Sequence, residues 1–282
     1  MNGATAEPGA AITDFSGKVA VITGGASGIG YATARALAEE GVRLVLADIE
    51  QAALDRAVSE LTGSGAEVIG VRTDVGERSS VQALADRTWE RFGAAHIIIN
   101  NAGVAVFGPT QDMSHEDWAW SMRVNLWGPI HGAEVFVPRM LRQGEGGHLV
   151  FTASFAGIVP NRDLGPYNVT KAGVVALAES LRKDLRGTGI GVSVLCPMRV
   201  TSNIDHSYRN RPADLGGPEI NNTYSEEELA ALQGRTLGAE PVAKLVLAGI
   251  RQNRLYIHTH KEAEALFRAR ADRIAAAFDH AI

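Results

Sequence analysis

Short, near-continuous runs of apolar residues alternate along this chain with longer stretches that mix apolar and polar residues. The short runs predict strands and the mixed stretches predict helices. The predicted strands are Lys18–Thr23, Arg43–Asp48, Glu67–Arg72, His96–Asn100, His148–Thr152, Ile190–Leu195 and about Leu255–His258. The predicted helices are Gly28–Glu40, Glu50–Leu61, Ser79–Phe92, a long stretch from about Ser114 to Leu141, Tyr167–Arg186, one near Pro241–Gln252 and a charged terminal helix.

Several predicted strands are apolar on both faces, as in Val19-Ala20-Val21-Ile22 and Ile97-Ile98-Ile99. Such strands suit a parallel sheet that is covered on both sides. Strands that alternate with helices and right-handed crossovers give a doubly wound α/β fold. We therefore expect a seven-stranded, mainly parallel sheet with helices on both faces, which binds its ligands beyond the carboxyl ends of the strands.

The length of 282 residues, 45% of them hydrophobic, suffices for one large α/β domain. No linker-like segment divides the chain, so we expect one domain over residues 17–282. Residues 1–16 lack the basic and apolar regions of a signal peptide and are expected to form a flexible N-terminal extension.

The formal charge of −5 and the pI of about 5.9 argue against nucleic acid or an anionic membrane as a partner. No apolar run reaches the ~20 residues of a membrane span. The single cysteine, Cys196, lies in an apolar run and is expected to be a buried side chain rather than a nucleophile. One cysteine also fits a reducing compartment, so we expect a cytoplasmic protein.

A glycine-rich turn follows the first predicted strand and opens the first predicted helix. Glycine permits a tight turn and a close approach of the backbone to a pyrophosphate, while the helix N-terminus offers free N–H groups. The alternatives are a merely glycine-rich turn or the similar turn of a methyltransferase. We predict that the turn binds phosphate through Gly24, Ser27, Gly28, Ile29 and Gly30.

Two acidic residues end neighbouring strands further along the chain. Asp48, followed by Ile49, can accept hydrogen bonds from the ribose diol of an adenosine and would repel a 2′-phosphate. No Arg or Lys stands beside Asp48 in the sequence, which favours NAD over NADP; the alternative is an ordinary strand-end aspartate. Asp74 and Val75 end the third strand, where they could meet an adenine edge.

Asparagines stand at two further positions. Asn100-Asn101-Ala102-Gly103 ends the fourth strand, where the Asn side chains can hold a turn and the small Ala102 and Gly103 leave room for a cofactor. Asn125 lies among apolar residues of the long helix and needs a hydrogen-bond partner there. It either holds a water against Lys171 or caps a helix irregularity.

Ser154 stands just past the fifth strand, and Tyr167 and Lys171 follow it at a spacing of one helical turn. A nearby ammonium is expected to lower the pKa of the Tyr167 phenol, which can then exchange a proton with a hydroxyl or carbonyl. The hydroxyl of Ser154 can donate to a developing oxyanion. A serine hydrolase is the competing reading, but the frame Thr152–Ala156 lacks its Gly-x-Ser-x-Gly motif.

Taken together, these residues resemble the short-chain dehydrogenase/reductase family, from about Lys18 to Thr201. The resemblance implies a Rossmann-type fold and a hydride transfer between a secondary alcohol or ketone and NAD. It implies that Tyr167 is the acid/base, that Lys171 lowers its pKa and binds the nicotinamide ribose, and that Ser154 orients the substrate oxygen. Asn125 would support a proton-relay water.

The resemblance extends to the region after the sixth strand. Pro197, Val200 and Thr201 would meet the nicotinamide end of the cofactor, while Met198 replaces the glycine usual in the family. The helices that carry Asn125 and Tyr167 would form a subunit interface, which implies a homotetramer or homodimer.

Residues 201–237 would cover a small-molecule substrate, with an apolar wall from Phe155, Ile158 and Val159 and further lining from Asn161 and Leu164. We expect a hydrophobic secondary alcohol or ketone. A nucleotide-binding sensor or scaffold of the same fold is the alternative; a sugar-nucleotide epimerase would need a larger C-terminal region.

No metal site is predicted: His258 and His260 are expected to be a surface or interface pair. Trp118, Trp120 and Trp127 are expected to pack in the core or at an interface.

Overall fold

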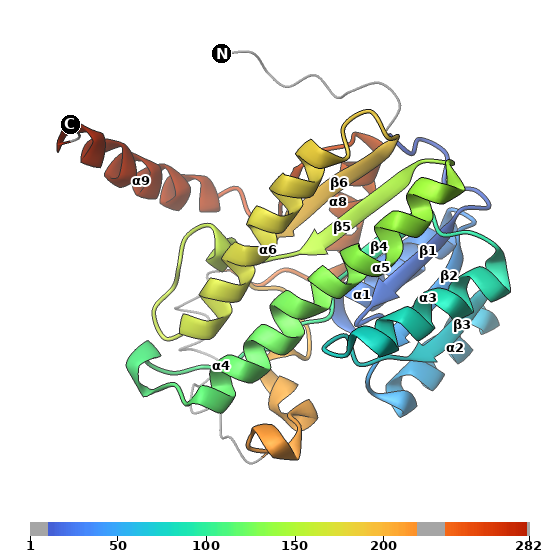
Figure 1. The fold of residues 1–282 in the computed structure, drawn as a ribbon, viewed down its shortest axis with the longest axis horizontal. Helices are drawn as coiled ribbons and strands as arrows, with labels where there is room; N and C mark the ends of the chain where they lie inside the picture. Colours follow the sequence, from blue (N-terminus) through green and yellow to red (C-terminus); the bar gives the residue numbers. More distant parts are fainter. Residues whose placement is uncertain (1–10, 219–234, 281–282) are drawn as a thin grey trace.

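The computed structural model describes residues 11–218 and 235–280 and is built on one sheet of seven parallel strands (Figure 1). Neighbours in the sheet follow the order β3-β2-β1-β4-β5-β6-β7, which reverses between β1 and β4. This confirms the predicted doubly wound fold. The strands are β1 Val19–Thr23, β2 Arg43–Asp48, β3 Val68–Arg72, β4 Ile97–Asn100, β5 Gly147–Thr152, β6 Ile190–Cys196 and β7 Tyr256–His258.

The helices lie where the sequence predicts them, with ends shifted by one or two residues. The α-helices are α1 Gly28–Glu39, α2 Gln51–Gly63, α3 Arg78–Phe92, α4 His115–Met122, α5 Gly128–Gln143, α6 Gly165–Asp184, α8 Ala239–Arg251 and α9 Ala263–Ala276. The long predicted helix is therefore α4 and α5 joined by a π-helical segment, η2 (Arg123–Trp127). Short 3₁₀ helices are η1 Thr110–Asp112, η3 Phe155–Gly157, η4 Ile204–Asn210, η5 Ala213–Leu215 and η6 Ala277–His280.

Alternate residues of each strand face opposite sides of the sheet, and each side has its own apolar core. Val19 and Val21 of β1 pack with side chains from α3, α5 and α6. Ala20 and Ile22 pack with side chains from α1, α2 and α8. Both faces of β1 are fully buried, as expected of a near-continuous apolar run in a parallel sheet.

Phe15 corrects the predicted start of the folded domain. Its ring is 1% exposed and packs in the core between the sheet and α1, α2 and α8, with the Arg251 guanidinium 4.8 Å from the ring centroid. The folded part of the chain thus begins before residue 17, because burial of one aromatic ring ties the end of the expected extension to the core. Residues 1–10 lie outside the described part.

All strands are parallel, so their carboxyl ends gather at one edge of the sheet. The glycine-rich turn, Asp48, Asn101 and Ser154 each directly follow a strand and therefore meet at that edge. Helix α9 projects away from the rest of the fold at the C-terminal end (Figure 1). In the described part of the chain, every helix is too short or too polar to traverse a bilayer.

Replacing Phe15 by Ala should lower the free energy of unfolding by about 3–5 kcal/mol, because it leaves a cavity in a closed core. Denaturant unfolding followed by circular dichroism measures this change. Phe278→Ala is the matched control, since that ring is 73% exposed and its loss should change stability by less than about 0.5 kcal/mol. Equal effects of the two substitutions would contradict the corrected domain start.

Candidate active site

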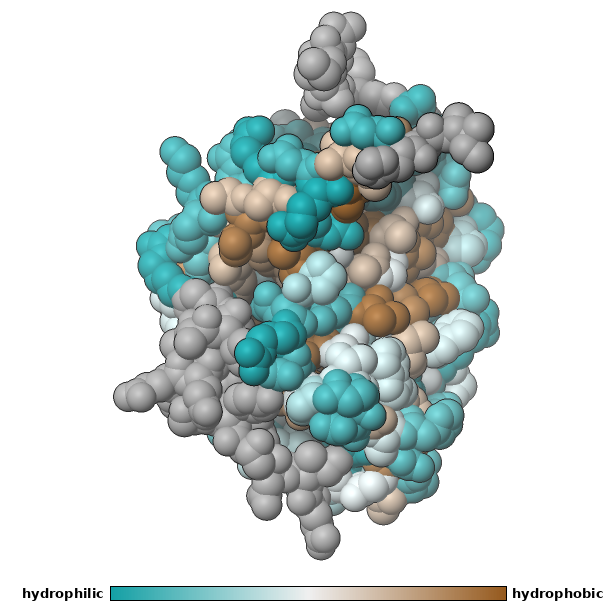
Figure 2. All heavy atoms as spheres, turned by 90° about the vertical axis from the view of Figure 1, so that its left-hand side faces the viewer, coloured by the Kyte–Doolittle hydropathy of each residue, from teal (hydrophilic) through white to brown (hydrophobic). Residues whose placement is uncertain are grey.

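A cleft opens beyond the carboxyl ends of the strands and collects most of the predicted site residues. Figure 2 views the molecule from the side toward which these strand ends point in Figure 1, and hydrophobic side chains are visible there between hydrophilic ones. The predicted residues that line the cleft are Gly24, Ser27, Gly28, Ile29, Asp48, Ile49, Asp74, Val75, Asn101, Ala102, Gly103, Ser154, Tyr167, Lys171, Pro197 and Val200. Gly30, Asn125 and Thr201 do not belong to this lining.

The glycine-rich turn packs closely on the segment after β4. Gly24 has φ +61°, and a Cβ there would lie 2.9 Å from the Cα of Ala102. Gly28 also has positive φ (+52°) and faces the cleft. Gly30 departs from the expectation of a direct cofactor contact: a side chain there would overlap the carbonyl oxygen of Gly24. Its role is close packing of α1 on the turn.

Asn101 fixes the turn to the sheet. Its Nδ2 donates to the carbonyl oxygens of Thr23 (3.1 Å) and Gly24 (3.2 Å). Its Oδ1 accepts from the hydroxyl of Thr152 at 3.3 Å, and its backbone N–H donates to the Thr23 hydroxyl. Asn101 thus has the turn-holding role predicted for the Asn pair, and it joins the ends of β1, β4 and β5, whereas Nδ2 of Asn100 is buried without a hydrogen-bond partner in the described part of the chain.

Asp48 occupies the far end of the cleft, where β2 ends. Its two carboxylate oxygens accept backbone N–H groups of Ala26 and Glu50, each at 3.1 Å. Burial raises the pKa of this carboxyl, and the two backbone hydrogen bonds oppose the shift. Asp48 therefore links the glycine-rich turn to the β2–α2 connection while still facing the cleft.

Sequence inspection around Asp48 missed a cation that the fold brings there. Arg209, from η4, donates through Nε (3.3 Å) and Nη2 to the carboxylate of Glu50, two residues after Asp48. Arg209 and Glu50 both line the cleft. Nothing in the local sequence signals this pair, because its members stand 159 residues apart.

Asp74 is already engaged by charged neighbours. Its Oδ2 accepts from Nη2 of Arg123 at 2.8 Å, and the same guanidinium reaches Glu77 at 3.0 Å. The other oxygen accepts from the backbone N–H of Gly76. His131 of α5 holds the adjacent Val75 carbonyl at 2.9 Å. The loop after β3 is thus fixed from the α4–α5 helix, with Asp74 and Val75 facing the cleft.

Asn125 lies in the π-helical segment, which is a helix irregularity of the kind that one of its two predicted roles requires. It is 0% exposed, and its side chain pairs with both backbone groups of Val104: Oδ1 accepts from N–H and Nδ2 donates to C=O, each at 2.8 Å. A Cβ on Gly103 would lie 3.3 Å from both Asn125 Oδ1 and Lys171 Nζ. Asn125 therefore positions Val104 and the segment after β4 beside Lys171. The proton-relay role of Asn125 stays a prediction.

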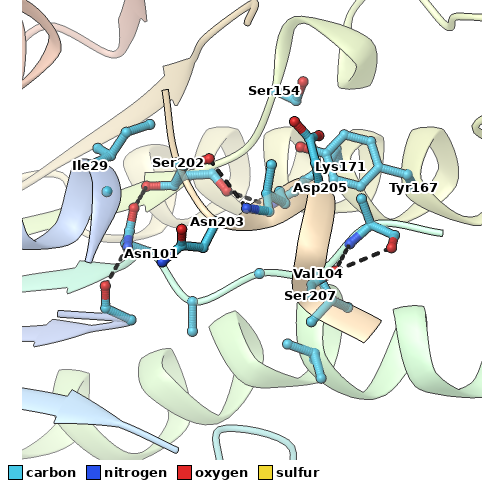
Figure 3. A pocket seen from close by; sticks show the side chains of 18 of the residues that line it. Ile29, Asn101, Val104, Ser154, Tyr167, Lys171, Ser202, Asn203, Asp205 and Ser207 are labelled. Atoms are coloured by element: carbon cyan, nitrogen blue, oxygen red, sulfur yellow. Dashed lines mark hydrogen bonds between the residues drawn. The ribbon is translucent and has the colours of Figure 1, made fainter. Parts of the chain in front are cut away.

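Ser154, Tyr167 and Lys171 converge at the other end of the cleft (Figure 3). Tyr167 and Lys171 lie on one face of α6, and the Lys171 Nζ is 5.5 Å from the centroid of the Tyr167 ring. The ammonium donates to the carbonyl oxygen of Thr152 at 2.8 Å. The Ser154 hydroxyl accepts from the backbone N–H of Ala156 at 3.1 Å. The predicted catalytic group is thus assembled from β5 and α6.

The pKa of Tyr167 shifts opposite to the sequence expectation. Burial raises the pKa of the phenol to about 12, the Ser154 hydroxyl opposes this through a hydrogen bond, and the nearby charge of Asp205 adds to it. Burial also lowers the pKa of Lys171 to about 8. Desolvation is the largest of these effects, so the Tyr167 phenol is in its neutral form at pH 7.

Of the residues predicted to meet the cofactor after β6, Pro197 and Val200 line the cleft and Thr201 does not. Thr201 is exposed and its N–H donates to Leu237, whereas Ser202 lines the cleft. A Cβ on Gly28 would lie 3.0 Å from the Ser202 Cβ, so Ser202 stands directly over the glycine-rich turn. Met198 lines the cleft as expected.

Apolar side chains contribute to the lining of the same cleft as Ser154, Tyr167 and Lys171. They include Phe107, Phe155, Leu164, Met198, Ile204 and Leu266, and the lining also contains the polar Asn161 and Asp205. Ile158 and Val159 lie outside the lining. Residues 219–234 of the expected substrate region are not in the described part of the chain.

Three remaining predictions concern residues outside the cleft. Cys196 is 1% exposed, and burial raises its pKa to about 12, as expected of an inert thiol. His260 is 2% exposed and binds the Arg235 carbonyl, so it forms no surface pair with the exposed His258. Trp120 is buried in a small cluster and Trp127 is 49% exposed. Within residues 11–218 and 235–280, no His, Cys, Asp and Glu side chains group as a metal site would need.

Comparison with known proteins agrees with this arrangement. The sequence profile of the family described as short chain dehydrogenase matches residues 18–213. A Cα-dehydrogenase of Sphingobium sp. strain SYK-6 is 37% identical over 93% of this chain and 88% of its own length. The 1-deoxy-11-β-hydroxypentalenate dehydrogenase of Streptomyces exfoliatus is 35% identical over 91% of this chain and 88% of its own. A short-chain dehydrogenase/reductase from Burkholderia phymatum, solved in complex with NAD, is 44% identical with a TM-score of 0.87, covering 94% and 96% of the two chains.

The buried ammonium should make stability depend on pH. The folded pKa of Lys171, about 8, lies below the unfolded value of 10.5, so the folded state releases its proton first. The contribution of Lys171 to the free energy of unfolding should therefore rise by about 2 kcal/mol from pH 8 to pH 10 and be lost again as the pH falls. The raised pKa values of the Cys196 thiol and the Tyr167 phenol oppose this rise in the total stability. The rise is therefore measured as the difference in unfolding free energy between the wild type and Lys171→Met in denaturant unfolding curves, which should change by that amount over this pH range.

Lys244→Met on the exposed side of α8 is the matched control and should keep the wild-type slope. A difference between the wild type and Lys171→Met that stays constant from pH 8 to pH 10 would contradict the lowered pKa of Lys171.

Proposed function

This chain belongs to the short-chain dehydrogenase family, and from that premise we propose that it interconverts a hydrophobic secondary alcohol and its ketone with NAD. Family membership makes it an oxidoreductase that acts on CH–OH groups. The observation that carries the proposal is the meeting of Ser154, Tyr167 and Lys171 at one end of a cleft whose other end holds Asp48.

The cleft has features that fit a dinucleotide. Gly28 and the N-terminus of α1 would take the pyrophosphate, since the turn presents backbone N–H groups without side chains in the way. Asp48 would accept the hydroxyls of the adenosine ribose. Ala102 and Gly103 leave the space in front of Lys171 that a ribose needs.

The chain's own groups would handle the proton. In the reductive direction the neutral Tyr167 hydroxyl donates to the carbonyl oxygen of the ketone, and Ser154 donates a hydrogen bond to the same oxygen. In the oxidative direction Tyr167 must first lose its own proton, and its phenolate oxygen then accepts the alcohol proton. NAD, when bound, supplies the hydride acceptor and a positive charge that lowers the pKa of a nearby phenol. Lys171 orients the ribose and adds its charge to that effect.

The choice of NAD over NADP rests on Asp48. Its carboxylate is held toward the cleft by two backbone N–H groups and would repel a 2′-phosphate. The Burkholderia relative binds NAD, which supports the same choice here.

The apolar lining around Tyr167 favours a hydrophobic substrate. Burial of apolar groups contributes roughly 25 cal/mol per Å², so such a wall gains most from a ligand with a bulky hydrocarbon or aromatic body. Two relatives are named Cα-dehydrogenase and 1-deoxy-11-β-hydroxypentalenate dehydrogenase, and the second name states a hydroxyl-bearing substrate. Asn161 and Asp205 are polar groups in the lining that would distinguish among hydrophobic substrates with different polar substituents.

Tyr167→Phe should abolish turnover while NADH still binds, because only the proton-transferring hydroxyl is removed. The assay follows NADH formation with NAD or NADP against a panel of apolar secondary alcohols, and NADH fluorescence reports binding. Tyr31→Phe, which removes a surface hydroxyl bonded to Glu60, is the control and should keep full activity. Better turnover with NADP, or with small charged substrates only, would overturn the respective part of the proposal.

We also propose a homo-oligomer, most simply a homotetramer or homodimer. Trp127 (49% exposed) and Val169 (51% exposed) lie on the neighbouring elements η2 and α6. These two exposed apolar side chains support a subunit contact on the surface formed by η2 and α6.

Light scattering at micromolar concentration should give a dimer or tetramer. Trp127→Glu combined with Val169→Glu should shift it toward monomer, because charge is then buried at the contact. A wild-type monomer would contradict the assembly.

A further inference from the structure

The adenosine end of the cleft carries an ion pair that spans its two sides. Arg209 of η4 donates to both carboxylate oxygens of Glu50, and Asn210 Nδ2 adds a hydrogen bond to Glu50 Oε1 at 2.9 Å. The paired side chains are about one-third exposed. The pKa of Glu50 is lowered, chiefly by the hydrogen bond from Arg209, so the carboxylate is ionised at neutral pH.

The guanidinium is held in place independently of Glu50. Its Nη1 donates to the carbonyl oxygens of His206 (2.7 Å) and Asn203 (3.2 Å) within the same 3₁₀ segment. The segment is tied to the opposite wall by Ser207, whose hydroxyl bonds both backbone groups of Ala105. Removing the Glu50 charge would therefore leave Arg209 near its present position.

Glu50 is also adjacent to the residue that selects the cofactor. Its backbone N–H donates to Asp48 Oδ1 at 3.1 Å, and Asp48, Glu50 and Arg209 all line the same end of the cleft. Arg209 is the guanidinium that lines this end together with the two carboxylates, whereas Arg72 donates from Nε to the Ile49 carbonyl oxygen and lies outside the lining.

We propose that Glu50 is a second determinant of NAD selectivity, because its carboxylate occupies Arg209 and so withholds a guanidinium that would bind the 2′-phosphate of NADP. This inference rests on the proposed function, namely binding of a nicotinamide dinucleotide with its adenosine ribose at Asp48. Arginine forms bidentate hydrogen bonds with phosphate as readily as with carboxylate, so the internal carboxylate and the external phosphate compete for one fork. Asp48 repels the phosphate, and Glu50 removes the group that would offset the repulsion.

The test measures dissociation constants of NADPH and NADH by fluorescence titration in the wild type and in Glu50→Gln. The amide keeps the size of the side chain but releases the charge. NADPH affinity should rise about tenfold relative to NADH, the gain of one charge-assisted hydrogen bond. Because the gain is electrostatic, it should shrink as salt is raised.

Two further variants identify the cause. Glu50→Gln combined with Arg209→Met should lose the gain in NADPH affinity, since the released fork is then absent. Glu264→Gln is the matched control: its carboxylate pairs in the same way with Arg268 on α9, and both affinities should stay at the wild-type values. Thermal unfolding of each variant checks its fold, and Glu50→Ser replaces Glu50→Gln if that variant is unfolded.

The outcomes separate the two proposals. Tighter binding of NADPH than of NADH by the wild type would overturn the role of Asp48 and this inference with it. If the wild type prefers NADH but Glu50→Gln leaves the preference unchanged, the inference alone is wrong. A gain that persists in the double variant would also overturn it, because Arg209 would not be its source.

Discussion

Desolvation of two ionisable side chains, the partly exposed Tyr167 and the buried Lys171, governs the charge state of this end of the cleft. Lys171 is 2% exposed, and its ammonium donates to the Thr152 carbonyl at the end of β5. Removing water raises the pKa of the phenol and lowers that of the ammonium, so both groups are biased toward their neutral forms. Added positive charge would have its largest effect on the phenol in such a site, because little solvent screens it. The Tyr167 phenol therefore stays protonated at neutral pH unless a further positive charge lowers its pKa.

The α4–α5 helix, with its π-helical segment, contacts both the surroundings of Lys171 and the loop after β3 on the other part of the cleft. Asn125 hydrogen-bonds to both backbone groups of Val104 beside Lys171. Arg123, in the same segment, forms an ion pair with the carboxylate of Asp74. π-Bulges inside helices often occur at functional sites, and here the bulge places the buried Asn125 amide against the backbone of Val104. One helix therefore fixes two loops that line opposite parts of the cleft, and it exposes Trp127 on its outer surface.

The sequence was sufficient wherever structure follows from local pattern. Apolar runs located every strand to within a residue, and glycine spacing located the turn after β1. The errors all concern effects of packing. Phe15 is buried through distant contacts, and Ser202 rather than Thr201 faces the cleft because of the chain direction after β6. The sign of the Tyr167 pKa shift depends on desolvation, which spacing does not reveal. Arg209 reaches Glu50 from 159 residues away, so no inspection of the β2 end could find it.

The most direct test of the account is to follow deuterium from NADH, labelled at its hydride-donating carbon, into the product of an apolar ketone. Mass spectrometry and proton NMR of the isolated alcohol locate the label. The account predicts deuterium on the carbinol carbon with the wild type and no labelled alcohol with Tyr167→Phe. An unlabelled alcohol, or labelled alcohol formed equally by the Tyr167→Phe variant, would contradict it.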